Sequence, residues 1–251
     1  MALPSPLPLA KPPITEALLD VQVTFPQAID VERLKELGTA LQSYYPQVRP
    51  LTVAMVTFQP QSGPPPPTPS FNQGLRGYSF LSKDAKEVVQ FRIDGFTYNR
   101  LAPYVSWEDM HGKGFAAWRD YRSAFPDGKV TRVATRFLNR ILLPLDQGEV
   151  ELDDYFNVGT KDPHEDTLLF ATFISNQFFI DLKTGFGANL NMAMQPVANE
   201  RLPVILDIEV FEQRLDQVAA TEPFSILTMM REVKNRLFLR ALTPKALKLF
   251  E

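Results

Sequence analysis

Residues 130–143 have the sequence VTRVATRFLNRILL, in which polar and apolar side chains alternate. In an extended strand, side chains two positions apart share a face. Three arginines therefore project to one side: Arg132, Arg136 and Arg140. Three apolar side chains project to the other: Val133, Phe137 and Ile141. The stretch predicts a long strand in an antiparallel sheet that has one face on the core and one polar face.

Further strands are predicted on both sides of this one. Residues 14–25 alternate in the same way, with Glu16, Asp20 and Gln22 on the polar side. Other strand-forming runs are bounded by turn residues and lie at 48–59, 77–81, 87–100, 167–181, 187–195 and 202–211. Between the first two of these runs, residues 60–77 are rich in proline and glycine, and we expect a long surface loop there.

Capping residues and apolar spacing predict three long helices. Asp30 begins one that continues to about Tyr45. Ser106 begins a second, and Pro223 stands at the first position of a third that continues to about Arg240. The second helix carries four aromatic residues that we expect in the core or at its edge: Trp107, Phe115, Trp118 and Tyr121.

The order of elements repeats along the chain. Residues 14–26 align without a gap on residues 132–144, and both stretches end at a proline. Each half is then strand, helix, several strands and a long helix, at 14–128 and 129–251, after an extended proline-rich arm at 1–13. The two halves predict one compact α+β unit with a curved antiparallel sheet and helices on one face. This arrangement resembles the TATA-binding-protein-like fold or a related helix-on-sheet architecture.

Composition excludes several classes of protein. The 251 residues contain no cysteine, which removes disulfides, thiolate metal sites and cysteine nucleophiles and fits a reducing cytoplasm. The net charge of -3 argues against general nucleic-acid binding, although a local basic strip could still contact phosphate. No apolar run reaches the roughly 18 residues of a membrane helix. Prolines interrupt the N-terminal apolar residues, so we expect no signal peptide and a cytoplasmic protein.

Common catalytic motifs are missing from the chain. It has no Gly-x-Ser-x-Gly elbow and no phosphate-binding P-loop sequence. The two histidines are His111, within a predicted helix, and His164, within an acidic loop at 162–166 that we expect to be solvated. The sequence therefore predicts no catalytic residue, no metal site and no cofactor.

The polar sheet face is the candidate site. Its predicted members come from three strands: Arg92, Asp94, Arg132, Arg136, Arg140, Asp207 and Glu209. They could form cross-strand ion pairs on a solvated sheet. They could instead line a groove that docks a protein partner or an anionic ligand through arginine forks. Asp207 and Glu209, with Asp94, could also serve a metal-dependent hydrolase or nuclease, and the space between sheet and helices could hold a small ligand.

Several ordered motifs resemble those of a sporadically distributed, uncharacterised bacterial family. They are PPITEA at 12–17, QFR at 90–92, GF at 95–96, RL at 100–101 with Tyr104 and Trp107, TRV at 131–133, RF at 136–137, NRI at 139–141, KN at 234–235 with Phe238, LT at 242–243, and Leu247. The resemblance implies a bacterial protein of one unit with no assigned reaction. A patchy distribution further implies a link to a defence or toxin-type conflict system.

Together these features predict a non-enzymatic interaction or regulatory protein of the bacterial cytoplasm. We expect a protein partner or an anionic ligand at the polar face, with nucleic acid less favoured, no membrane, and a homodimer allowed. The alternatives are a metal-dependent hydrolase or nuclease and a binder of small ligands.

Overall fold

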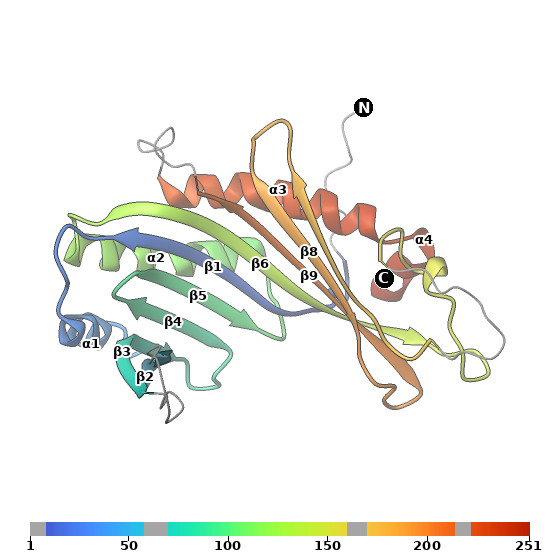
Figure 1. Ribbon diagram of the computed structural model, residues 1–251, viewed down its shortest axis with the longest axis horizontal. Coiled ribbons are helices and arrows are strands. Elements are labelled where there is room, and N and C mark those ends of the chain that lie inside the picture. The colour runs from blue at the N-terminus through green and yellow to red at the C-terminus, as the bar shows by residue number, and fades with distance from the viewer. Residues whose placement is uncertain (1–8, 58–69, 160–169, 214–221) are drawn as a thin grey trace, which may run out of the picture.

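The computed structural model describes residues 9–57, 70–159, 170–213 and 222–251, without the side chains of residues 53–57 and 70–73. Within these residues, nine strands form one open antiparallel sheet (Figure 1). The strand order is β2-β3-β4-β5-β1-β6-β9-β8-β7, so β1 and β6 pair at the centre while β2 and β7 lie at the two edges. The predicted α+β class with an antiparallel sheet is confirmed.

The strands of the first half are β1 (Ile14–Thr24), β2 (Gln47–Thr57), β3 (Ser70–Leu81), β4 (Glu87–Arg92) and β5 (Gly95–Leu101). Those of the second half are β6 (Lys129–Pro144), β7 (Ile174–Ile180), β8 (Gly187–Met194) and β9 (Arg201–Glu212). The stretch at 130–143 is thus the body of β6, which pairs with β1 on one side and with β9 on the other.

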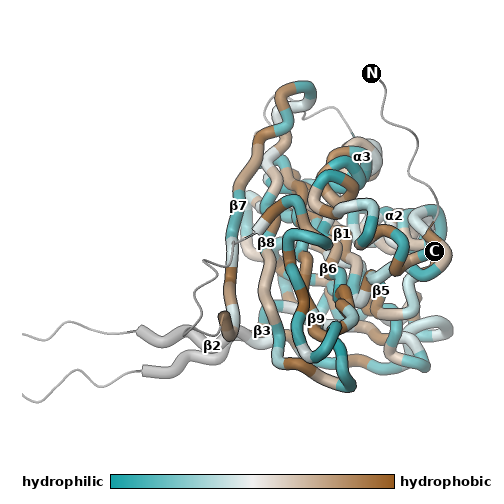
Figure 2. Tube along the Cα trace, turned by 90° about the vertical axis from the view of Figure 1, so that its right-hand side faces the viewer, coloured by the Kyte–Doolittle hydropathy of each residue, from teal (hydrophilic) through white to brown (hydrophobic). Residues whose placement is uncertain are grey.

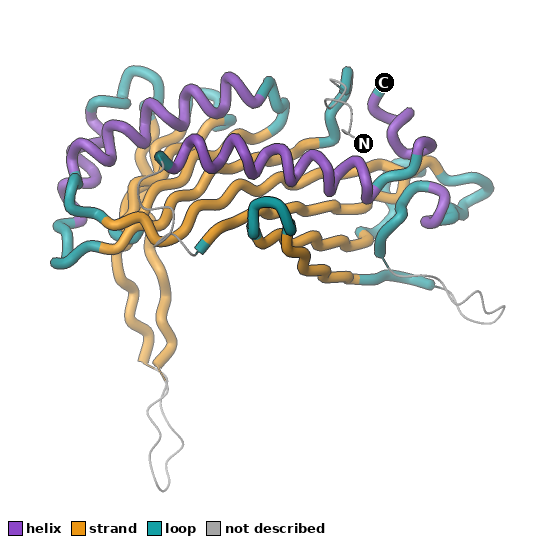
Figure 3. Tube along the Cα trace, turned by 90° about the horizontal axis from the view of Figure 1, so that it is seen from above, coloured by secondary structure: helices purple, strands orange, loops and turns teal. Residues whose placement is uncertain are grey.

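Helices α1 (Val31–Thr39), α2 (Trp107–Ala124) and α3 (Pro223–Ala241) precede a short C-terminal helix, α4 (Pro244–Leu247). Two short 3₁₀ segments are η1 (Leu152–Asp154) and η3 (Lys248–Phe250). Figure 3 shows α2 and α3 on the same side of the sheet. The predicted caps are present: Asp30 accepts a hydrogen bond from the Glu32 N–H, and Ser106 accepts one from the Asp109 N–H.

The core lies between the sheet and the helices. The apolar faces of β1, β6 and β9 contribute side chains without solvent exposure, including Leu19, Val133 and Ile208. Trp107, Trp118 and Tyr121 are buried on α2, as the sequence predicts. Phe115 is 40% exposed and lies at the edge of the core, which the prediction also allowed. It packs edge-on against Phe224 at the outer margin of the α2–α3 contact.

The predicted strand 87–100 is in fact a hairpin, β4–β5. A turn at Ile93 and Asp94 separates the two strands, and Gly95 follows it with a φ of +148°. The buried apolar positions change from Phe91 before the turn to Phe96 after it, which breaks the two-residue alternation, and the prediction of one continuous strand overlooked this break. Asp94 therefore lies in the turn instead of on a strand, although its carboxylate still reaches Arg92.

Other element boundaries also differ from the prediction. β3 begins at Ser70, inside the predicted loop 60–77, and residues 58–69 lie outside the described part. α1 ends at Thr39, because residues 40–44 turn back to bring Tyr45 against the sheet. β7 begins at Ile174, the described residues 170–173 before it are not in a strand, and the first residues of the predicted strand, 167–169, lie outside the described part.

The described part of the N-terminal arm, residues 9–13, lies against the body. The Pro13 carbonyl accepts a hydrogen bond from the Arg140 N–H at 2.8 Å, and the Lys11 N–H donates to the Phe250 carbonyl at 2.9 Å. The start of the described chain and its C-terminus are therefore neighbours. Among the described residues, no helix is long and apolar enough to cross a membrane.

Candidate functional site

The sheet face opposite α2 and α3, called the open face here, carries a row of ion pairs. Arg132 contacts Glu209 at 2.7 Å and Asp20 at 3.8 Å, which joins β9, β6 and β1. Asn189 on β8 donates to the other Glu209 carboxylate oxygen at 3.1 Å. The alternation of polar residues places these side chains on one face, and the strand order places them next to one another.

The same row continues across the first half. Arg92 contacts Asp20 at 2.9 Å and Asp94 at 3.1 Å, and Arg76 contacts Asp94 at 2.8 Å. Burial alone would raise the pKa of Asp94, but the hydrogen bonds and charges of Arg76 and Arg92 outweigh it and hold that pKa below its usual value. Asp20 was visible in the sequence as a polar-face residue, whereas nothing in the sequence identified its partners.

A second row contains the best-formed pair on this face. Arg136 donates from Nε and Nη2 to the two oxygens of Asp207, at 2.8 and 2.7 Å. The Asp207 side chain is only 7% exposed. Asn191 also donates to Asp207 at 3.3 Å, and Asn176 donates to Asn191 at 2.7 Å, so the row reaches β7. The hydrogen bonds that Arg136 donates to Asp207 raise the pKa of Arg136 above its usual value.

The predicted site residues therefore lie on one face, but most of their charges are already paired. The guanidinium groups of Arg92, Arg132 and Arg136 each contact a carboxylate of this chain. Arg140 differs, because it is exposed and its side chain donates to the neutral Gln195 at 3.3 Å. These contacts are cross-strand ion pairs, which was one of the alternatives predicted from the sequence. Arg140 is therefore the arginine of this set that is most accessible for contact with a partner.

The carboxylates offer little to a metal ion. Both Asp207 oxygens accept from Arg136, and Glu209 accepts from Arg132 and Asn189, so a metal would have to displace these donors. Across the described residues, no group of three or more histidine or acidic side chains could hold a metal. His111 Nε2 lies 3.0 Å from the Phe224 carbonyl, and His164 lies outside the described residues.

β7 is an apolar edge strand that sequence reasoning did not single out. Its sequence ISNQFFI has no charge, and Figure 2 shows it at the margin of the molecule, in mixed hydrophobic and hydrophilic colours. Ile174 is 77% exposed, and Phe178 and Ile180 are each 59% exposed. By alternation these three share the open face with Asn176. The missing charge was readable in the sequence, but the edge position was not.

The opposite edge differs in residue type. β2 carries Arg49 and Pro50 near its start. A charged side chain and a proline discourage further strand pairing, since one resists desolvation and the other has no N–H to donate. β7 carries neither device between Ile174 and Ile180. Of the two edges, β7 is therefore the one better suited to accept another strand.

A polar cluster on the helix side surrounds Glu87. Its carboxylate accepts hydrogen bonds from Lys113 at 2.6 Å, Arg100 at 2.7 Å and Tyr45 at 3.1 Å. Burial alone would raise the pKa of Glu87, but these donors, Lys113 foremost, hold it below its usual value. Burial also raises the pKa of the neighbouring Tyr98, whose hydroxyl has no hydrogen-bond partner in the described structure. The cluster ties α2 to the sheet.

Lys234 is the most unusual cation on the helix side. It extends from α3 toward β6, and its Nζ lies 4.0 Å from the centroid of the Phe137 ring. Tyr104 meets the same ring edge-on. No carboxylate in the described part of the chain pairs with this ammonium. Burial, reinforced by the positive charge of Arg231, lowers the pKa of Lys234 to about 7.

This depressed pKa predicts a dependence of stability on pH. Between about pH 7 and the ordinary lysine pKa near 10.4, the unfolded chain binds a proton at this side chain that the folded chain does not. The free energy of unfolding should therefore rise with pH across that window. The buried tyrosines act in the opposite direction near pH 10, because their pKa values are raised and the unfolded chain therefore loses these protons first. The rise should therefore show between about pH 7 and pH 9, and thermal unfolding measured over that range tests it.

Lys234→Met is the matched variant for this measurement. It keeps an unbranched side chain over Phe137 but removes the charge, so it should be more stable than the parent at pH 7 and should flatten the pH profile. An unchanged profile in Lys234→Met would show that other groups produce the slope.

The chain was compared with known proteins. A scan against models of protein families gives no match, and a search of curated proteins gives none either.

Proposed function

We propose that this chain is a non-enzymatic interaction protein that docks a protein partner along β7 and the adjoining open face. The observation that carries the proposal is the uncharged β7 edge, with the side chains of Ile174, Phe178 and Ile180 exposed. The partner would be an extended segment that adds to the sheet as a further strand. Backbone hydrogen bonds would supply affinity, and side chains on alternate positions would supply specificity.

The polar side chains of the neighbouring open face would form a rim around this contact. Phe178 stacks on Phe211 with ring centroids 6.2 Å apart, and the Arg132 guanidinium lies 4.8 Å from the Phe211 ring centroid. The apolar edge thus joins the first row of ion pairs directly. Neutralised pairs do not attract an anion strongly, so we favour a protein partner over an anionic ligand at this face. Arg140 remains available for one charged contact.

Phe178→Lys is the variant that tests the docking edge. A lysine at this position must be desolvated when a strand pairs there, so partner capture should fall about tenfold or more. Tyr44→Lys is the matched control, because Tyr44 is 76% exposed in the turn after α1. Quantitative co-purification from the source cells, with the tagged parent chain and both variants, measures the effect. Amide hydrogen exchange of β7 should slow when the partner is bound.

The outcomes of this experiment are distinct. Loss of one stoichiometric protein in Phe178→Lys alone, with slower exchange in β7, supports the proposal. Equal capture by parent, variant and control contradicts it. If light scattering instead shows a dimer that Phe178→Lys dissociates, the edge joins two copies of the chain and the proposed partner is wrong.

The arginines of the open face need a variant that removes a charge without breaking an ion pair. Arg136 cannot report on binding by itself, because it holds the buried Asp207. Arg140→Ala removes an exposed charge and leaves both rows of ion pairs in place. A partner that uses the open face should therefore lose affinity in Arg140→Ala without loss of fold.

We also infer that the two halves are a pseudo-repeat. The sheet order supports this, because β1, β5 and β4 on one side of the centre correspond to β6, β9 and β8 on the other. Each half then ends in its longest helix, α2 or α3. A relation to the TATA-binding-protein-like architecture is part of the same proposal. No function is transferred with it.

Membership of the sporadically distributed bacterial family also stays a proposal. Its support is that motif residues distant in sequence meet in space. Tyr104, Phe137 and Lys234 form one contact group between the sheet and α3. The Thr15 hydroxyl from the N-terminal motif donates to the Leu138 carbonyl at 3.2 Å.

A further inference from the structure

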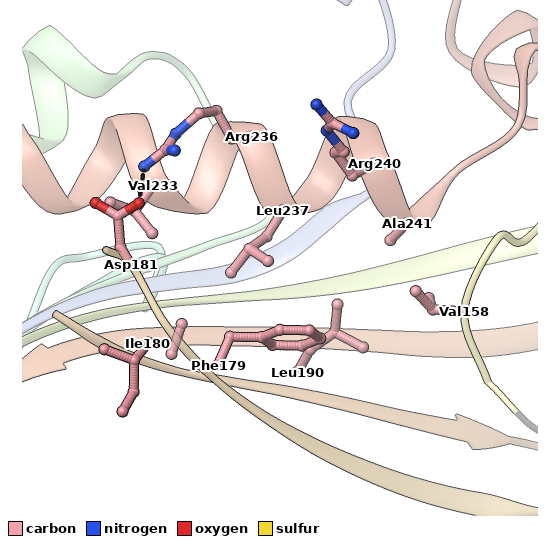
Figure 4. A pocket seen from close by; sticks show the side chains of 11 residues that line it. Val158, Phe179, Ile180, Asp181, Leu190, Val233, Arg236, Leu237, Arg240 and Ala241 are labelled. Carbon is pink, nitrogen blue, oxygen red and sulfur yellow. Dashed lines mark hydrogen bonds and ion pairs between the residues drawn. The ribbon is translucent and has the colours of Figure 1, made fainter. Parts of the chain in front are cut away.

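A pocket of about 310 Å³ lies between α3 and the strands β7 and β8 (Figure 4). It forms because α3 packs on β6 and β9 and leaves the outer strands only partly covered. Phe179 on β7 is consequently 37% exposed, although its side chain faces the helix side. The volume is at the lower end of the range for small-molecule sites.

The walls of the pocket are mostly apolar. Phe179 and Leu190 contribute from the sheet, and Leu237 contributes from α3. Such walls favour a ligand with a hydrocarbon body, because its burial removes apolar surface from water. They would not hold a sugar or a nucleotide, whose many polar groups would lose their hydrogen bonds to water.

One ion pair marks the polar end of the pocket. Arg236 Nη2 contacts Asp181 at 2.6 Å, and Figure 4 shows this pair beside the apolar residues. Asp181 also accepts from the Thr184 hydroxyl at 2.7 Å and from the Thr184 N–H at 3.2 Å. These donors outweigh the effect of burial and hold the pKa of Asp181 below its usual value. Asp181 therefore remains ionised, and its contact leaves other N–H donors of the Arg236 guanidinium group available.

A second cation lines the same end. Arg240 follows Arg236 by one helical turn, so the two side chains lie on neighbouring parts of the α3 surface. Arg240 is exposed, and in Figure 4 its side chain points away from the strands. No acidic side chain in the described structure pairs with it. An exposed arginine changes rotamer rapidly, so its guanidinium can turn to a group at the pocket mouth. Arg236, Arg240 and Asp181 together give the pocket mouth a net positive charge.

We propose that this pocket binds a small amphipathic monoanion, namely a straight-chain carboxylate. The hydrocarbon chain would lie among Phe179, Leu190 and Leu237. The carboxylate would accept hydrogen bonds from Arg240 and from the free donors of Arg236. This site is on the helix side of the sheet and does not depend on the partner proposed for the open face.

The test uses octanoate, decanoate and dodecanoate below their micelle concentrations, with decanol as the uncharged match. The carboxylates should raise the Tm of the purified chain in a saturable manner, because they bind the folded state. Calorimetry should show that decanol binds about tenfold more weakly than decanoate, since it makes no charge-assisted hydrogen bond. No saturable effect of any carboxylate, or equal affinity for decanol and decanoate, would overturn the proposal.

Two variants locate the site. Arg240→Gln removes an exposed charge and should weaken decanoate about tenfold with little effect on decanol. Leu237→Trp places a larger side chain in the pocket and should abolish binding of both. Arg119→Gln, an exposed arginine on α2, is the matched control and should bind both probes as the parent does. If Leu237→Trp fails to fold, Arg240→Gln still decides, because unchanged decanoate affinity in that variant overturns the assignment.

Discussion

Arg136→Ala is expected to lower the free energy of unfolding by about 2–3 kcal/mol, because it leaves the Asp207 carboxylate buried without its charged partner. Two hydrogen bonds are lost, and Asn191 alone continues to donate to that carboxylate. The Arg136 side chain is itself 45% exposed, which places the expected loss below that of a fully buried pair. Chemical denaturation followed by circular dichroism measures it, and the midpoint of thermal unfolding should fall by roughly 5–10 °C.

Two controls separate pairing from simple loss of an arginine. Arg140→Ala should change stability by no more than about 0.5 kcal/mol, because its contact is an exposed one with Gln195. The double variant Arg136→Leu with Asp207→Leu should recover much of the lost stability, since neither charge is then left unpaired. If Arg136→Ala is as stable as Arg140→Ala, the Arg136–Asp207 pair does not stabilise the sheet.

Gly95→Ala is expected to destabilise the chain by about 4 kcal/mol, which combines about 1–3 kcal/mol of backbone strain with a similar steric term. Gly95 has a φ of +148°, a conformation that residues with a side chain rarely adopt. A Cβ atom at this position would lie 2.2 Å from the Val21 carbonyl oxygen on β1. That obstacle is backbone in the centre of the sheet, so it cannot move aside as a flexible side chain would. Denaturation experiments, or failure to obtain folded protein, check this.

Gly112→Ala is the matched control for this prediction. Gly112 lies exposed within α2, and nothing lies within 4 Å of a Cβ placed there. Alanine should raise stability by about 0.5–1 kcal/mol, because it lowers the entropy that the helix backbone loses on folding. Equal losses in Gly95→Ala and Gly112→Ala would contradict the steric argument.

The open face and the Glu87 cluster show which contacts can be predicted from a pattern of polar residues in the sequence and which cannot. Alternation correctly placed Arg132, Arg136 and Asp207 on one face, since the two-residue period of a strand is a local property. It could not show that Arg136 meets both oxygens of Asp207. Nor did it identify Glu87 as the acceptor for three donors from separate elements. The sequence of one strand determines which of its side chains share a face. The order of all the strands determines which side chains of different strands are neighbours on that face.

The sequence by itself determined the elements whose signals are local. The alternation over 130–143 predicted β6. The caps Asp30 and Ser106 and the first-position proline Pro223 predicted the starts of three helices. Composition excluded cysteine chemistry. The hairpin at Gly95 was missed because the prediction joined two strands across a break in the apolar alternation, between Phe91 and Phe96.

Only the tertiary structure decided where function could lie. It placed the uncharged β7 at an edge of the sheet, brought Arg236 beside Asp181, and left a pocket where α3 does not cover the outer strands. The physical reason is that strand order and helix placement maximise burial across the whole chain. Such burial joins residues far apart in sequence, and no local pattern encodes those contacts.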